Sequence, residues 1–242
     1  MRDWLMRQVP PVTAFAGVAL APALLLIWGA TGGGGWPLWA GFLWMAIAAP
    51  LADTLIARGF GDARPGARFP GADLLLVVLA AVHLGLMLAA LGGFAGDGLG
   101  WPARIALFLG AGMWFGQVAN STAHELIHRG DRRLFRLGAG IYVSLLFGHH
   151  VSAHRLVHHI HVATPEDPNS ARSGESFWRF LPRAWTGSFR EGWRAEARRA
   201  RQSGRANPYL YWVSGAAGCI LLAFALFGAR AGLDYILLCL YA

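Results

Sequence analysis

Long apolar runs constrain the fold of this chain more than any other feature of its sequence. A helix needs roughly 20 predominantly apolar residues to cross about 30 Å of hydrocarbon. Five runs meet that requirement, at residues 12–30, 36–57, 74–95, 105–123 and 208–228. A sixth apolar run, at residues 231–242, has about half of that length. The sequence therefore predicts one all-α, polytopic membrane domain of about six transmembrane helices, with the sixth incomplete.

The charged residues fit a membrane protein better than a nucleic-acid-binding one. Only 14% of the residues are charged, where a soluble domain has about a quarter. The formal net charge is +8, but all 21 basic residues are arginines and all of them lie outside the apolar runs. This distribution is typical of membrane topology rather than of a DNA-reading face. We therefore expect no nucleic-acid partner.

Arginine placement also predicts the orientation of the chain, because cytoplasmic loops carry the excess of basic residues. Arg2 and Arg7 precede the first run, and Arg58, Arg64 and Arg68 follow the second. Arginines also dominate the charged residues between 128 and 206. We expect a multi-pass protein of the bacterial inner membrane, with its N-terminus and the region 124–207 in the cytoplasm. Within that region, residues 138–148 are expected to form a re-entrant or interfacial helix, and residues 179–205 to lie along the interface.

Histidines supply the strongest chemical signal. Eight of the nine fall between His124 and His161. His124 and His128 have i, i+4 spacing, and so do His154 and His158, with His159 adjacent. This spacing places two imidazoles on one face of a helix, about one turn apart. Neutral imidazole is a good ligand for iron, zinc or copper, so the pattern predicts a metal site.

The first histidine pair also satisfies the HExxH pattern of zinc proteases, in which Glu125 would serve as the general base. A single zinc site leaves the second histidine group without a role, whereas two groups suit two metal ions held between helices. The spacing by itself does not exclude other metals. Cys219 and Cys239 lie in apolar runs without CxxC spacing, so we expect buried thiols rather than a disulfide or a zinc ribbon.

Four segments resemble the integral-membrane alkane 1-monooxygenases and xylene monooxygenases, within the membrane fatty acid desaturase and hydroxylase superfamily. Residues 120–129 (NSTAHELIHR) look like the first histidine box of these enzymes. Residues 154–159 (HRLVHH), followed by residues 162–172 (VATPEDPNSAR), are similar to the second box and the segment after it. Residues 50–53 (PLAD) also resemble a family feature. The resemblance is sharpest from residue 120 to residue 175.

The resemblance implies which residues form the site. The five ligands of two non-haem iron ions would come from the two histidine boxes: His124, His128, His154, His158 and His159. Acidic side chains near the ligands would orient the imidazoles, and the candidates are Glu125, Asp53 and Asp167. The remaining histidines near the boxes are expected to be outer or surface residues: His149, His150 and His161.

The resemblance also implies the reaction and its partners. The expected reaction is O2-dependent hydroxylation of the terminal methyl of an alkane or a similar apolar alkyl substrate that reaches the enzyme through membrane lipid. Electrons would come from rubredoxin or a ferredoxin-type donor with its reductase, docked on the arginine-rich region. Trp44 and His83 are candidate residues of the substrate channel, because a bulky ring can limit chain length and an ionisable group inside a span is a functional candidate.

One departure from the family pattern bears on activity. The third histidine box of the family, and the histidine group that follows it, do not occur in the 242 residues. Five imidazoles do not complete two iron coordination spheres, so we hypothesise that this chain is a truncated product or a fragment and inactive alone. Other hypotheses are a membrane fatty-acid desaturase or sterol-type oxidase, which are less similar over residues 162–172, an intramembrane zinc protease and a metal transporter.

Overall fold

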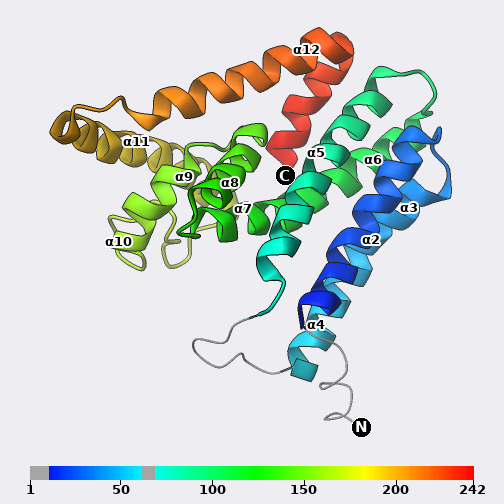
Figure 1. The fold of residues 1–242 in the computed structure, drawn as a ribbon, viewed down its shortest axis with the longest axis horizontal. Coiled ribbons are helices and arrows are strands. Elements are labelled where there is room, and N and C mark those ends of the chain that lie inside the picture. Colours follow the sequence, from blue (N-terminus) through cyan, green and yellow to red (C-terminus); the bar gives the residue numbers. More distant parts are fainter. Residues whose placement is uncertain (1–10, 61–68) are drawn as a thin grey trace. The chain divides into compact units, whose positions relative to one another are not determined.

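A computed structural model describes residues 11–60 and 69–242, and every regular element within these ranges is helical (Figure 1). The elements follow one another as α2 (Pro11–Thr31), α3 (Trp36–Leu43), η1 (Trp44–Ala48), α4 (Ala49–Phe60), α5 (Ala72–Ala95), α6 (Trp101–Trp114), η2 (Phe115–Ala119), α7 (Asn120–Ile127), α8 (Arg132–Ser144), α9 (His150–Ala153), η3 (His154–His158), α10 (His159–His161), α11 (Phe177–Ser203) and α12 (Pro208–Tyr241). Those labelled η are single π turns. The chain divides into two compact units, Met1–Gly138 with Ile220–Ala242, and Ala139–Cys219.

All of the predicted apolar runs are helical. Within the described residues, four helices are long and apolar enough to cross a membrane: Val12–Thr31, Trp36–Leu55, Ala72–Ala95 and Pro208–Tyr241. The run 105–123 lies in the uninterrupted helical stretch from α6 to α7. The last two predicted runs together form α12, which bends at Gly228, a residue with φ 83°. The all-α class is confirmed, and the exact number of spans stays a prediction. Of the arginines on which the orientation depends, Arg2, Arg7, Arg64 and Arg68 lie outside the described residues.

Within the first unit, two tryptophans bind backbone carbonyls of α2. Pro22 lies inside α2 and has no N–H to donate to the carbonyl of Val18. The indole of Trp44 donates to that carbonyl at 3.1 Å, and the buried indole of Trp114 donates to the carbonyl of Ala19 at 2.7 Å. Each bond gives an indole N–H a partner in an otherwise apolar interior. The kink-forming proline and these two indoles therefore fix how η1 and α6 pack against α2.

Glycines allow the first hairpin to close. Residues 33–35 are glycines with φ of 83°, 98° and 83°, a region that side chains rarely adopt, and they lie in the turn between α2 and α3. Gly110 of α6 lies where an added Cβ would be 2.8 Å from Leu26 and 3.2 Å from the Cα of Phe42. Three helices therefore approach one another closely at Gly110.

Two arginines satisfy the carbonyls at the end of α5. Arg104 donates to the carbonyls of Phe94 at 2.7 Å and Leu99 at 2.9 Å, and also to that of Gly96. Arg230, in the second half of α12, donates to the carbonyl of Phe94 at 3.0 Å and pairs with Asp97 at 3.1 Å. The last carbonyls of a helix lack partners within it. These contacts anchor the segment after the bend of α12 to the first unit.

The second unit is built around α11, which packs against α9 and η3. The predicted interfacial segment 179–205 is helical over most of its length, as part of α11. Residues 138–148, predicted as a re-entrant or interfacial helix, form the second half of α8 and the turn after it. Placement of both segments in a membrane interface stays a prediction.

Candidate metal centre

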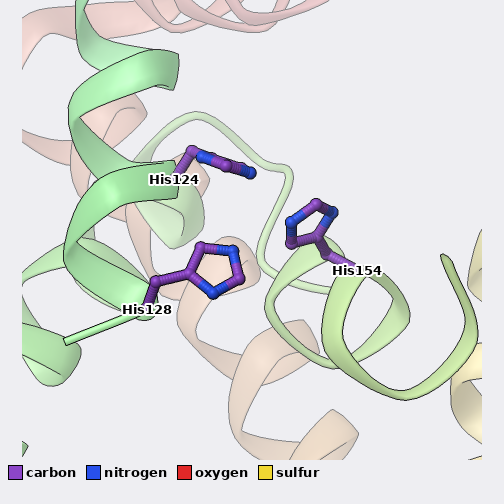
Figure 2. Close-up of side chains that lie close together, drawn as sticks. All are labelled: His124, His128 and His154. Atoms are coloured by element: carbon purple, nitrogen blue, oxygen red, sulfur yellow. The ribbon is translucent and has the colours of Figure 1, made fainter. Parts of the chain in front are cut away.

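The first histidine pair lies on α7, directly after the π turn η2. His124 is half-buried and His128, at the end of the helix, is exposed. Their ring centroids are 4.8 Å apart, and Figure 2 shows both rings projecting from the same side of the helix, as i, i+4 spacing predicts. Arg129 and Asp73 form an ion pair at 2.9 Å, which joins the end of α7 to the start of α5.

The second histidine group is shaped by the π turn η3. His154, labelled in Figure 2, begins this turn and is buried. A π turn closes its hydrogen bonds between residues five apart, so His154 and His159 come to the same face of the helix. The Nε2 atoms of these two histidines are 2.9 Å apart, whereas the rings of His154 and His158 stack at 5.3 Å. The pair with converging nitrogens is therefore the i, i+5 pair.

A buried carboxylate orients the third member of this group. His158 Nδ1 lies 2.9 Å from Oδ2 of Asp167, whose side chain is fully buried. The same carboxylate accepts from the Ser170 hydroxyl at 2.7 Å and from the backbone N–H of Asn169 at 3.0 Å. Burial raises the pKa of Asp167, but these hydrogen bonds outweigh burial and leave the pKa below its usual value. Asp167 is therefore ionised and accepts a hydrogen bond from the Nδ1–H of His158.

The other predicted acidic side chains are placed differently. Glu125 is exposed, and its carboxylate is 3.9 Å from Nδ1 of His124, which is too long for a hydrogen bond. Asp53 lies exposed on α4. The structure thus brings one predicted acidic residue, Asp167, within hydrogen-bond distance of a histidine of the boxes, whereas Glu125 lies 3.9 Å from His124.

The two candidate channel residues lie inside the first unit. Trp44 is half-buried, and the carbonyl of Val18 accepts its indole N–H. His83 is buried on α5, with its ring 5.1 Å from that of Phe115. Both positions are compatible with packing, and their role in a channel stays a prediction.

The remaining histidines near the boxes are not equivalent. His149 is buried, with its ring 4.8 Å from Phe147 and 5.4 Å from Phe189, so it is not a surface residue. Burial lowers the pKa of His149 to about 4, which keeps this imidazole neutral near pH 7. His150 stacks on His154 at 5.0 Å, and His161 is half-buried at the end of α10.

Comparison with known proteins places this arrangement in a family. The family model of fatty acid desaturases matches residues 99–242, which include both histidine groups. The chain belongs to this family. Its helical fold and its long apolar helices are those of a multi-pass membrane protein.

Several curated relatives are alkane 1-monooxygenases, which confirms the resemblance drawn from the histidine boxes. The chain is 36% identical to alkane 1-monooxygenase 1 of Pseudomonas aeruginosa over 78% of its own length and 51% of that enzyme. It is 27% identical to alkane 1-monooxygenase 1 of Alcanivorax borkumensis and to alkane 1-monooxygenase of Pseudomonas putida, in each case over 84% of its own length and 49% of the relative. The chain therefore spans about half the length of the curated relatives it matches.

The residues of this fatty acid desaturase family member fit a metal ion bound by imidazole nitrogens. Two neighbouring ligands that each lie about 2.0–2.1 Å from one ion at a right angle are about 3 Å apart. The Nε2 atoms of His154 and His159, at 2.9 Å, match this separation. His158 gives its Nδ1 to a carboxylate, so its Nε2 is the nitrogen left for a metal, which is the arrangement usual for metal-bound histidine.

Sequence reasoning missed two supporting residues. Glu196, buried in α11, accepts from the Ser152 hydroxyl at 2.8 Å, and Ser152 accepts from the indole of Trp212 at 3.1 Å. Arg183 of α11 binds the segment that contains Asp167. Glu196 shares this strongly basic helix with a second acid, Glu191, so the charge pattern alone did not single it out. No pattern separated Arg183 from the other arginines.

Proposed function

We propose that this protein takes part in O2-dependent hydroxylation of alkyl groups, the terminal methyl of alkanes or of similar apolar compounds, at a centre of two non-haem iron ions. The observation that carries the proposal is the second histidine group, in which two Nε2 atoms converge and a third imidazole is held by a buried carboxylate. Similarity to alkane 1-monooxygenases supplies the reaction class.

The proposed ligands are the five histidines of the two boxes: His124, His128, His154, His158 and His159. A tetrahedral zinc site needs four ligands at most, so the number of imidazoles favours two ions. Further ligands are needed to complete two coordination spheres. The proposal therefore treats these five side chains as a part of the complete ligand set.

Iron, when bound, would supply the activation of O2 and the oxidation of the C–H bond. The reaction consumes the alkane, O2, two electrons and two protons, and it yields the alcohol and water. The chain's own residues fix the site: Asp167 holds His158 in the Nδ1–H tautomer, and the π turn holds His154 beside His159. Glu125 and Asp53 are proposed to orient imidazoles when ligands are in place.

The substrate and the electrons are proposed to arrive by different routes. An apolar alkyl compound dissolves in the bilayer and can approach between helices, along a channel to which we assign Trp44 and His83. The two electrons would come from rubredoxin or a ferredoxin-type donor with its reductase, on the cytoplasmic side of the bacterial inner membrane. The exposed arginines of α11 offer a docking face for an acidic carrier.

Desaturation is the second candidate reaction, because the fatty acid desaturase model covers residues 99–242. The two reactions differ in their product, since hydroxylation adds an oxygen atom and desaturation removes two hydrogens. Mass spectrometry of products formed from a deuterated n-alkane and from a fatty acyl substrate separates them.

Metal analysis tests the proposal directly. We expect the protein, purified in detergent and loaded with Fe(II) without oxygen, to retain iron, and His154→Ala and His128→Ala each to reduce the iron retained per chain. His161→Ala, which removes a histidine outside the proposed ligand set, is the matched control and should retain as much iron as the wild type. Tight retention of zinc in preference to iron, together with peptide hydrolysis, would support the protease hypothesis and contradict this one.

A further inference from the structure

Polar contacts, rather than apolar packing, hold the segment that carries Asp167. Residues 163–172, here called the Asp167 turn, follow the second histidine group. A hollow of about 610 Å³ borders the turn and is lined by Thr164, Pro165, Ser170, Arg172 and Arg183, among others. Apart from the buried Asp167, the side chains of the turn are exposed or half-buried, so the turn gains little from apolar burial. The position of Asp167 must therefore depend on directed hydrogen bonds.

Arg183 of α11 supplies two of those bonds. Its Nη1 donates to the carbonyl of Pro168 at 2.9 Å, and its Nη2 donates to the carbonyl of Ser170 at 3.1 Å. The same guanidinium binds both oxygens of Glu175, at 2.7 Å and 2.5 Å. Hydrogen bonds from Arg183 lower the pKa of Glu175 to about 2, so the carboxylate is ionised. The planar fork of an arginine is suited to holding several acceptors at fixed positions.

Two more positions of α11 contact the turn. Ser188 donates to the side-chain oxygen of Asn169 at 2.9 Å. Gly187 lies so close to Pro168 that an added Cβ would be 2.7 Å from the proline Cβ. Residue 187 follows residue 183 by about one helical turn, and residue 188 is its neighbour. The Asp167 turn therefore packs against these positions of α11.

Asp167 connects these positions of α11 to the histidine group. The backbone N–H of Asn169 and the hydroxyl of Ser170 fix the two oxygens of Asp167, and the carbonyls of Pro168 and Ser170 are those that Arg183 holds. Oδ2 of Asp167 then meets Nδ1 of His158 at 2.9 Å. We infer that Arg183 is a positioning residue for His158: it holds the Asp167 turn so that the carboxylate of Asp167 fixes the orientation of the His158 ring. The inference rests on the proposed metal site.

A double-mutant cycle on metal affinity tests this role. The full chain in detergent, free of metal, would be titrated with Co2+, and binding would be followed by the d–d absorption of the ion. Removing a partner that orients a ligand typically weakens metal binding by about 10- to 100-fold. We expect losses of this size for Asp167→Asn, Arg183→Ala and Arg183→Lys, because lysine lacks the fork. The double variant D167N/R183A should lose no more than D167N alone.

Two further variants separate positioning from loss of charge and from loss of folding. Arg190→Ala removes an exposed arginine from the same helix and should bind Co2+ as the wild type does. Glu175→Gln keeps Arg183 but removes the charged partner of its guanidinium, so it should lower the affinity for Co2+ by less than Arg183→Ala does. Thermal unfolding of each metal-free variant shows whether it folds. If R183A does not fold, E175Q and R183K still test the role of Arg183.

The outcomes distinguish this inference from the proposed function. If wild type binds Co2+ and His158→Ala weakens binding while R183A and R183K match R190A, the role of Arg183 is overturned and the metal site stands. Full rescue by R183K, or losses that add in D167N/R183A, would also overturn the role. If the wild type binds no Co2+, the proposed metal site fails and the inference fails with it.

Discussion

Replacing Ser152 with alanine removes the partner of two buried groups in a single substitution. The Ser152 hydroxyl donates to Glu196 at 2.8 Å and accepts from the indole N–H of Trp212 at 3.1 Å. Ser152 lies on α9, two residues before His154, while Glu196 is on α11 and Trp212 is on α12. One hydroxyl therefore joins three helices of the second unit beside the histidine group.

The expected cost follows from the groups that lose their partners. A buried donor or acceptor without a partner costs about 1–3 kcal/mol, and more if it is charged. Glu196 keeps a second partner, because its other oxygen lies 3.7 Å from Arg199, which is largely exposed. For Ser152→Ala we therefore expect a loss of about 2–4 kcal/mol in the free energy of unfolding. Trp212→Phe, which leaves the bond between Ser152 and Glu196 intact, should cost less.

Chemical unfolding in detergent micelles, followed by tryptophan fluorescence, measures this loss. Ser214→Ala is the matched control, because Ser214 is exposed on α12 and its hydroxyl bonds only to the carbonyl of Tyr211 within the same helix, at 3.3 Å. The control should stay within about 0.5 kcal/mol of the wild type. A Ser152→Ala variant that is as stable as Ser214→Ala would refute the reasoning, since the network would then contribute nothing to the unit.

Three further predictions concern packing and pH. Gly187→Val should destabilise the protein by about 1–3 kcal/mol, because its Cβ would overlap Pro168, and faster trypsin cleavage at Arg172 would report the displaced turn. Trp114→Phe removes the indole N–H that the carbonyl of Ala19 accepts and should cost about 0.5–1.5 kcal/mol in the same unfolding assay. Burial lowers the pKa of His149 to about 4, so as the pH falls the unfolded chain is protonated at this residue before the folded chain is. The contribution of His149 to the free energy of unfolding is therefore complete above about pH 6.5 and falls as the pH drops toward 4. His149→Phe should flatten that part of the curve of stability against pH.

Each of these predictions has an outcome that would contradict it. Gly218→Ala, at a position where an added Cβ meets nothing within 4 Å, is the control for the first, and equal stability of the two variants would be evidence against close packing at Gly187. For the second, an unchanged midpoint would mean that the carbonyl of Ala19 finds another partner. An unchanged slope of stability between pH 6.5 and 4 in His149→Phe would show that burial does not hold this imidazole neutral.

Features that depend on local sequence could be predicted, and those that depend on distant partners could not. The apolar runs indicate helices because a spanning helix must be apolar along its length, and i, i+4 spacing places His124 and His128 on one face. The i, i+5 pairing of His154 with His159 was not predicted, because an inserted π turn leaves no trace in a 3.6-residue period. The bond from Trp114 to Ala19 joins residues 95 positions apart, and no local pattern specifies it.

The arginines of α11 show why charge alone was an insufficient guide to the second unit. The sequence alone does not distinguish one of these arginines from another, and membrane topology and docking of an acidic carrier explain their number equally well. In the structure, the guanidinium of Arg183 is occupied by two carbonyls and a carboxylate, whereas Arg198 and Arg201 are exposed. Exposed charges at the edge of an interface change association rates and their salt dependence, while buried or occupied ones act on structure. Charge reversal at Arg198 and Arg201 should therefore slow the reduction of the proposed metal centre by an acidic donor protein at low salt and leave the affinity for Co2+ unchanged. Substitution of Arg183, in contrast, should lower the affinity for Co2+.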